Sequence, residues 1–125
     1  MTKRILVVED QEDNRRIIRD LLTSVGYELI EATDGGAGVR LAEAERPDLI
    51  LMDIQLPVLD GHEATRRIKQ NPALRHIPII VVTSYALSGD DAKAMAAGSD
   101  AYVAKPFSPR QLLATIRRFL PEERA

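Results

Sequence analysis

The sequence contains no cysteine, so disulfide bonds, thiolate metal sites and cysteine nucleophiles are all excluded. It also has no long apolar run, because stretches such as 49–52 and 77–82 fall far short of the ~20 residues that a membrane-spanning helix needs. The N-terminal apolar run stops at Glu9 and Asp10, before it reaches the length of a signal-peptide core. We therefore expect a cytoplasmic protein without a membrane partner.

A surplus of positive charge is missing as well. The 17 lysine and arginine residues face 19 aspartate and glutamate residues, which gives a net charge of −2. Proteins that bind nucleic acids or anionic membranes usually carry a basic surplus on one face, so no direct nucleic-acid partner is expected. We interpret the three arginine pairs as solvated helix faces; they are Arg15-Arg16, Arg66-Arg67 and Arg117-Arg118.

The chain does contain a regular alternation of short apolar runs and segments with helical spacing. Continuous apolar runs such as 49–52 are typical of parallel strands that are covered on both faces. We predict strands at 5–8, 27–32, 49–52, 79–82 and 101–103.

Helical segments separate the predicted strands. The first ends at Gly26 and places five apolar residues on one face: Ile17, Ile18, Leu21, Leu22 and Val25. Further helices are predicted at 36–45, between Asp60 and Asn71, and at 90–97. The last helix begins after Ser108, with Pro109 at the first helical position and Gln111 in a capping-box arrangement.

These elements predict one α/β domain over residues 1–121, followed by a polar tail at 122–125, with no output domain. Five βα units with right-handed crossovers give a doubly wound open parallel sheet, a flavodoxin-like (βα)5 fold with helices on both faces. The expected strand order is 2-1-3-4-5. Ligands of such sheets bind beyond the carboxyl ends of the strands, so the residues there are the candidates for function.

Polar residues follow four of the five predicted strands. They are Glu9 and Asp10 after the first strand, Asp53 after the third, Thr83 and Ser84 after the fourth, and Lys105 and Pro106 after the fifth. Any one of them could be a helix cap or strand filler. Because parallel strands end at the same edge of a sheet, all of them should converge there and form a site.

The expected cluster is acidic. Glu9, Asp10 and Asp53 contribute three negative charges and Lys105 one positive charge, so the sum is −2. Oxygen ligands without histidine or cysteine favour a hard divalent cation, and Mg²⁺ fits best, with Mn²⁺ as a substitute. A carboxylate beside this ion, with Lys105 and the Thr83 hydroxyl nearby, suits phosphoryl transfer in which Asp53 is the nucleophile.

In order and placement, several segments resemble the receiver domain of bacterial two-component response regulators, over essentially the whole chain. They are Val7-Val8-Glu9-Asp10; Leu49 to Pro57 with Asp60-Gly61; Val81 to Ser84; and Gly98 to Tyr102 leading to Lys105-Pro106-Phe107. Within this family, the isolated domain and the segment Met-Asp-Ile-Gln-Leu-Pro are most similar to the stand-alone cell-division regulators of the DivK type.

The resemblance implies that Asp53 accepts a phosphoryl group from a sensor histidine kinase or a histidine phosphotransfer protein. Asp10, Asp53 and the backbone carbonyl of Gln55 would hold Mg²⁺, and Glu9 would act through a bound water. Lys105 would pair with the phosphoryl oxygens, and its bond to Pro106 is expected to be cis. The protein would not be an enzyme beyond catalysing its own phosphorylation and slow dephosphorylation.

The resemblance also implies a conformational switch. The Thr83 hydroxyl would move toward the phosphoryl group and the Tyr102 ring would turn inward. This movement would remodel the face formed by the helix at 90–97, the strand at 101–103 and the last helix. Through that face the protein would bind a downstream target or form a phosphorylation-dependent homodimer. A protein that remains a monomer and acts in a phosphorelay is an equal alternative.

Some positions depart from the commonest family pattern. Glu9 replaces a more frequent aspartate, which lengthens the arm and favours contact through water. Ser84 replaces a small alanine and should still leave the phosphoryl pocket open. Gln55 and Tyr85 stand where side chains of this family control water access to the acyl phosphate, and the bulk of Tyr85 predicts slow self-hydrolysis.

Other functions remain open at this stage. A phosphohydrolase of the haloacid-dehalogenase type also uses a strand-end aspartate and Mg²⁺, but its second aspartate is replaced here by Gln55. A flavin or nucleotide binder could use the glycines at 35–38, although they match neither phosphate-binding fingerprint and a turn into a helix is the simpler interpretation. A degenerate receiver would act as a binding module without phosphorylation. His62 and His76 have no partner at ligand spacing, and we interpret them as surface residues.

Overall fold

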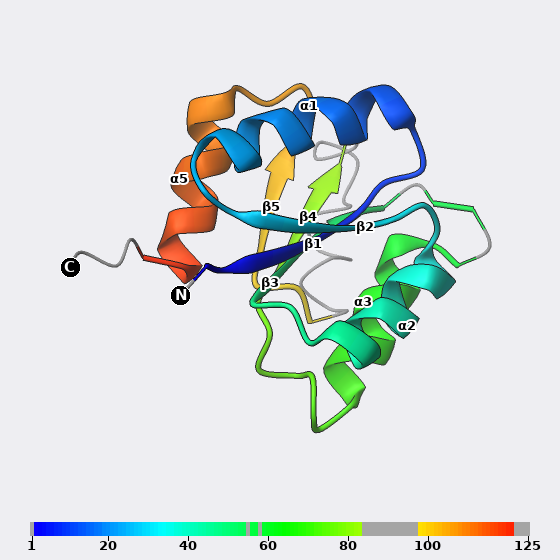
Figure 1. Cartoon of the computed structure of the whole chain (residues 1–125). Coiled ribbons are helices and arrows are strands. Elements are labelled where there is room, and N and C mark those ends of the chain that lie inside the picture. Colours follow the sequence, from blue (N-terminus) through cyan, green and yellow to red (C-terminus); the bar gives the residue numbers. More distant parts are fainter. Residues whose placement is uncertain (1, 55, 58, 84–97, 122–125) are drawn as a thin grey trace.

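The computed structural model describes residues 2–54, 56–57, 59–83 and 98–121. Five parallel strands form one sheet in the order β2-β1-β3-β4-β5, which confirms the predicted topology (Figure 1). The strands are β1 (Arg4–Val8), β2 (Glu28–Ala32), β3 (Leu49–Asp53), β4 (Ile79–Thr83) and β5 (Ala101–Ala104). The helix predicted at 90–97 lies outside the described residues.

Helices cover both faces of the sheet. Figure 1 shows α1 (Glu12–Ser24) and α5 (Pro109–Phe119) on one face, and α2 (Gly35–Glu45) and α3 (Gly61–Gln70) on the other. Side chains alternate along each strand, so Leu51 and Ile80 pack toward α1 and α5, whereas Ile50 and Val81 pack toward α2 and α3. In the part of the chain that the structure describes, no helix is long and apolar enough to cross a membrane.

Side-chain caps fix where three of these helices begin, and the sequence predicted two of these starts. The Ser108 side chain accepts a hydrogen bond from the backbone N–H of Gln111 at 3.0 Å, and Pro109 is the first residue of α5, as the sequence predicts. Asp60 caps α3 in the same way, since its Oδ1 accepts a hydrogen bond from the N–H of Glu63 at 3.0 Å. The predicted starts of both helices are therefore confirmed.

The predicted apolar stripe of α1 is partly wrong. Ile18 and Leu22 are buried, but Ile17 is 58% exposed, and Val25 lies beyond the last helical residue. Consecutive helical residues are about 100° apart, so Ile17 falls at the edge of the stripe that Ile18 and Leu22 define. Arg15 stands three residues before Ile18 and seven before Leu22, and its side chain is only 15% exposed. The expectation of a solvated face is therefore wrong for Arg15.

Gly35 and Gly38 allow close packing at the start of α2. A Cβ added at Gly35 would lie 1.9 Å from the backbone oxygen of Leu59, and one at Gly38 would lie 2.9 Å from the Val8 side chain. The absent side chains therefore let α2 approach both the segment before α3 and the strand β1. This close approach favours the interpretation of these glycines as a turn into a helix over a phosphate-binding loop.

Candidate functional site

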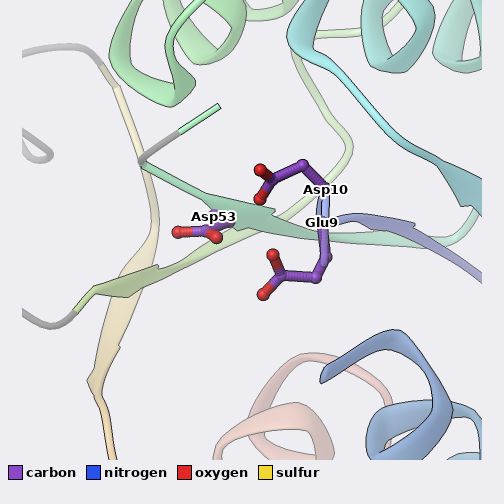
Figure 2. A group of neighbouring side chains, drawn as sticks. All are labelled: Glu9, Asp10 and Asp53. Carbon is purple, nitrogen blue, oxygen red and sulfur yellow. The ribbon is translucent and has the colours of Figure 1, made fainter. Parts of the chain in front are cut away.

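Three carboxylates meet at the carboxyl edge of the sheet. Asp53 ends β3, while Glu9 and Asp10 follow β1, whose last residue, Val8, pairs with Met52. One carboxylate oxygen from each of Glu9, Asp10 and Asp53 can be chosen so that all lie within 4.8 Å of one another. Figure 2 shows the three groups around a common space, two from the end of β1 and one from β3.

Lys105 provides the counter-charge for this cluster. Its Nζ lies 3.0 Å from Glu9 Oε1 and 3.2 Å from Asp53 Oδ2. Glu9 is 2% exposed and Asp53 is 7% exposed, so both carboxylates are paired with Lys105 in a largely buried setting. Burial by itself would lower the pKa of Lys105, but the charges of Asp53 and Glu9 outweigh it and raise that pKa. Lys105 is therefore a firmly protonated cation that joins β5 to β1 and β3.

Thr83 and Pro106 lie next to Lys105, whereas Tyr102 lies farther from it. The backbone N–H of Lys105 donates to the carbonyl oxygen of Thr83 at 2.7 Å, and the Lys105–Pro106 peptide bond is cis. Thr83 is buried at the end of β4. Tyr102 lies farther back along β5, opposite Val81, and is 41% exposed.

The cluster is short of positive charge. Partial burial, together with the hydrogen bond and the charge of Glu9, raises the pKa of Asp10 above its ordinary value of 3.8. The charged form of Asp10 is thus disfavoured beside Glu9, even with Lys105 close by. Carboxylate oxygens are the donors that Mg²⁺ and Mn²⁺ prefer, so this set of residues fits such an ion.

Some of the remaining predicted site and surface residues lie in the described part of the chain, and others lie outside it. Gln55, Ser84 and Tyr85 lie outside the described residues. His76 is exposed, as expected for a surface residue. His62 is half-buried and both of its ring nitrogens are buried, so the interpretation of His62 as a surface residue is only partly right.

Gly61 contacts the site although its part was not predicted. A Cβ at this position would lie 2.1 Å from the carbonyl oxygen of Asp53, and the N–H of Gly61 donates to the carbonyl oxygen of Ile54 at 2.9 Å. The first turn of α3 therefore packs directly against the backbone of the residue that we expect to react. The Asp60-Gly61 pair in the sequence was the available signal.

Arg15 also contacts the site. Its Nη1 donates to the carbonyl oxygens of Glu9 at 3.0 Å and Asp10 at 3.1 Å. The spacing in the sequence could have predicted that Arg15 is partly buried, because Arg15 continues the buried stripe of Ile18 and Leu22 toward the start of α1.

A cavity of about 460 Å³ opens beside the acidic cluster. Asn14, Ile17 and Ile18 of α1 line one part of it and Pro106 and Phe107 another, while Glu9 and Lys105 belong to both the cavity and the cluster. The exposed Ile17 side chain is thus an apolar wall next to the charged site.

The fold and this acidic edge define a receiver domain. The family described as "Response regulator receiver domain" matches residues 5–117, and the chain belongs to that family. Among its relatives, the polar-differentiation response regulator DivK of Brucella ovis is 44% identical over 120 residues, which cover 96% of this chain and 98% of that protein. The protein is therefore a response regulator of two-component signalling, not an enzyme with an external substrate.

Solved structures of other receivers agree with this assignment. The receiver domain of the sensor histidine kinase PA1611 from Pseudomonas aeruginosa, with a magnesium ion coordinated in its active site cleft, matches with a TM-score of 0.91 and 42% identity. That match covers 98% of this chain and 100% of the other. The Mn²⁺-bound form of the response regulator Rcp1 matches with a TM-score of 0.82 and 31% identity, over 98% of this chain and 97% of the other.

Proposed function

We propose that this chain is a cytoplasmic response regulator that accepts a phosphoryl group on Asp53. A carboxylate oxygen of Asp53 would form the bond to phosphorus while the phosphorus–nitrogen bond of a phosphohistidine breaks and the imidazole leaves. The donor would be a sensor histidine kinase or a histidine phosphotransfer protein. The observation that carries this proposal is the position of Asp53 Oδ2, 3.2 Å from Lys105 Nζ, at the edge where Glu9 and Asp10 also lie.

The same cluster would hold the metal ion. We propose that Asp10 and Asp53 bind Mg²⁺ or Mn²⁺ directly, with the backbone carbonyl of Gln55, and that Glu9 acts through a water molecule. When bound, the ion would neutralise charge on the oxygens of the transferring phosphoryl group. The oxygen-only donor set supports this assignment, as do the ions in the PA1611 and Rcp1 structures.

Lys105 would pair with a phosphoryl oxygen, and Thr83 would transmit the change. The buried Thr83 ends β4, and Tyr102 lies on the adjacent strand, opposite Val81. We propose that the Thr83 hydroxyl, with Ser84 beside it, moves toward the phosphoryl group and that the exposed Tyr102 ring turns inward. The affected face, made of β5, α5 and the segment at 90–97 for which the sequence predicts a helix, would then bind a target protein or a second copy of the chain.

The phosphoryl donor would approach across the cavity beside the cluster. The apolar side chains of Ile17 and Phe107 suit an apolar residue of a partner, and Lys105, which also lines the cavity, contacts Asp53.

We propose that residues 1–121 form one receiver domain and that its signal leaves through a protein contact or a phosphorelay. Gln55 and Tyr85 would control water access to the acyl phosphate, which predicts slow self-hydrolysis.

The test is to incubate the protein with acetyl phosphate and Mg²⁺ and to measure its intact mass. We expect the gain of one phosphoryl group, which disappears with EDTA and in Asp53→Asn. No adduct in the wild type would contradict the proposal and favour a degenerate receiver that only binds partners. Steady turnover of phosphomonoesters would instead indicate the phosphohydrolase.

A further inference from the structure

Arg15 connects α1 to the short segment that carries two of the three carboxylates. Its Nη1 donates hydrogen bonds to the carbonyl oxygens of both Glu9 and Asp10, at 3.0 Å and 3.1 Å. We propose that Arg15 is a positioning residue for metal binding, because these two bonds hold the Glu9–Asp10 backbone where its side chains converge with Asp53. This inference rests on the proposed function, in which those carboxylates bind Mg²⁺.

A second charged residue holds Arg15 in place. Its Nε lies 3.4 Å from Glu31 Oε1, and Glu31 comes from β2 on the side of the sheet that faces α1. Arg19, one turn further along α1, donates from Nε to Glu31 Oε2 at 2.9 Å and from Nη2 to Oε1 at 2.7 Å. The two hydrogen bonds from the Arg19 guanidinium thus fix the Glu31 carboxylate, and Glu31 in turn orients the guanidinium of Arg15.

The carbonyl groups that Arg15 contacts lie outside the regular hydrogen-bond pattern of the strand and the helix. The N–H of Glu9 pairs with the carbonyl oxygen of Ala32 at 3.0 Å, which ends the β1–β2 ladder. Helix α1 begins at Glu12, so the carbonyls of Glu9 and Asp10 lie between the two regular elements. Arg15 is a hydrogen-bond partner for both carbonyls. A fixed backbone also opposes the mutual repulsion of the three carboxylates, which would otherwise drive Asp10 outward.

The charge of Arg15 and its positioning role predict opposite changes in Mg²⁺ affinity when Arg15 is removed. The positive guanidinium repels a divalent cation, so its removal would tighten Mg²⁺ binding if only charge mattered. Its hydrogen bonds keep the carboxylates together, so its removal would weaken Mg²⁺ binding if positioning dominates. Groups that orient metal ligands typically change affinity by about 10- to 100-fold, and we expect an effect of about tenfold here because Arg15 holds backbone atoms.

The test is the Mg²⁺ dissociation constant of the full chain, measured by calorimetry or by amide NMR shifts. We expect Arg15→Ala to raise the constant about tenfold. Arg15→Lys keeps the charge but cannot bridge two carbonyls and Glu31, so it should also raise the constant. Arg19→Ala removes a positive charge yet should weaken binding to a smaller extent, because Glu31 loses its support. Arg16→Ala, the exposed neighbour, is the matched control for charge and should not weaken binding.

A second readout separates positioning from the later chemistry. In the Arg15 variants, phosphorylation by acetyl phosphate should rise more steeply with Mg²⁺ concentration than in the wild type, because added metal offsets the weaker binding. Unchanged or tighter Mg²⁺ binding in Arg15→Ala would overturn the inference, and so would wild-type affinity in Arg15→Lys. If Arg15→Ala does not fold, as shown by circular dichroism, Arg15→Lys and Arg19→Ala decide the question.

The outcome for the proposed function is independent of this result. If the wild type gains no phosphoryl group while Arg15→Ala and Arg15→Lys still weaken Mg²⁺ binding, the proposed function fails and the positioning role stands. If the wild type is phosphorylated on Asp53 but the Arg15 variants bind Mg²⁺ normally, the positioning role fails alone.

Discussion

At the scale of single residues, the charge balance of the site depends on Lys105. Its Nζ is within 3.2 Å of carboxylate oxygens from both Glu9 and Asp53, which are largely buried. Removing this cation would take a counter-charge away from two largely buried carboxylates, which costs more than the loss of an exposed ion pair.

We therefore expect Lys105→Met to lower the free energy of unfolding by about 1–3 kcal/mol in EDTA, measured by urea denaturation. The loss should be smaller in Mg²⁺, because a bound cation would replace part of the missing charge. Arg110→Met is a suitable control, since Arg110 is an exposed cation at the start of α5 and its loss should cost less than about 0.5 kcal/mol. Equal losses for Lys105→Met with and without Mg²⁺ would contradict this account.

At the scale of elements, the contact between β3 and α3 supports the backbone of Asp53, the residue that we propose to be phosphorylated. A Cβ at Gly61 would lie 2.1 Å from the carbonyl oxygen of Asp53 and 2.7 Å from the Cα of Ile54, and both are backbone atoms that cannot rotate away. Either the start of α3 or the end of β3 must therefore shift if Gly61 gains a side chain.

We expect Gly61→Ala to destabilise the protein by about 2 kcal/mol or more and to slow phosphorylation of Asp53 by acetyl phosphate. Gly26→Ala is the matched comparison, because Gly26 has a φ of +96° but no atom within 4 Å of an added Cβ. That change should cost only about 1 kcal/mol through backbone strain and leave the phosphorylation rate unchanged. Normal phosphorylation of Gly61→Ala would show that the β3–α3 contact does not position Asp53.

At the scale of the whole molecule, metal binding, stability and pH are linked. Asp10 has a raised pKa, so the native state binds its proton more tightly than the unfolded chain does. Its contribution to stability is therefore lost as the pH rises from about 3.8 through the raised pKa, and at neutral pH the ionised Asp10 is unfavourable without a cation. A bound divalent ion would reverse this effect, because it binds only the native cluster.

We expect Mg²⁺ to raise the melting temperature at pH 7, with a gain of about 2.7 kcal/mol when its concentration is 100 times the dissociation constant. The gain should shrink as the pH falls toward and through the raised pKa of Asp10, because protons compete with the metal. Thermal melts with Mg²⁺ or EDTA at several pH values measure this gain. If Mg²⁺ does not change the melting temperature at pH 7, the result would argue against the metal site.

Much of this arrangement could be predicted before the structure. The continuous apolar runs at 49–52 and 79–82 predicted buried parallel strands, and these strands extend by one residue, to Asp53 and Thr83, because a polar last residue can still join the backbone ladder. The caps at Asp60 and Ser108 were readable because a side chain three residues before a backbone N–H defines them locally.

The amino-acid sequence by itself determined the order of strands and helices, the two-faced core, and the arrival of Glu9, Asp10, Asp53, Thr83 and Lys105 at one edge. These features follow from hydrophobic periodicity and from the rule that parallel strands end on the same side. Only the tertiary structure decided that Lys105 lies between Glu9 and Asp53, that Gly61 touches the Asp53 backbone, and that Arg15 is a clamp fixed by Glu31. Those contacts join residues of different elements, and side chains choose such partners only after the elements have packed.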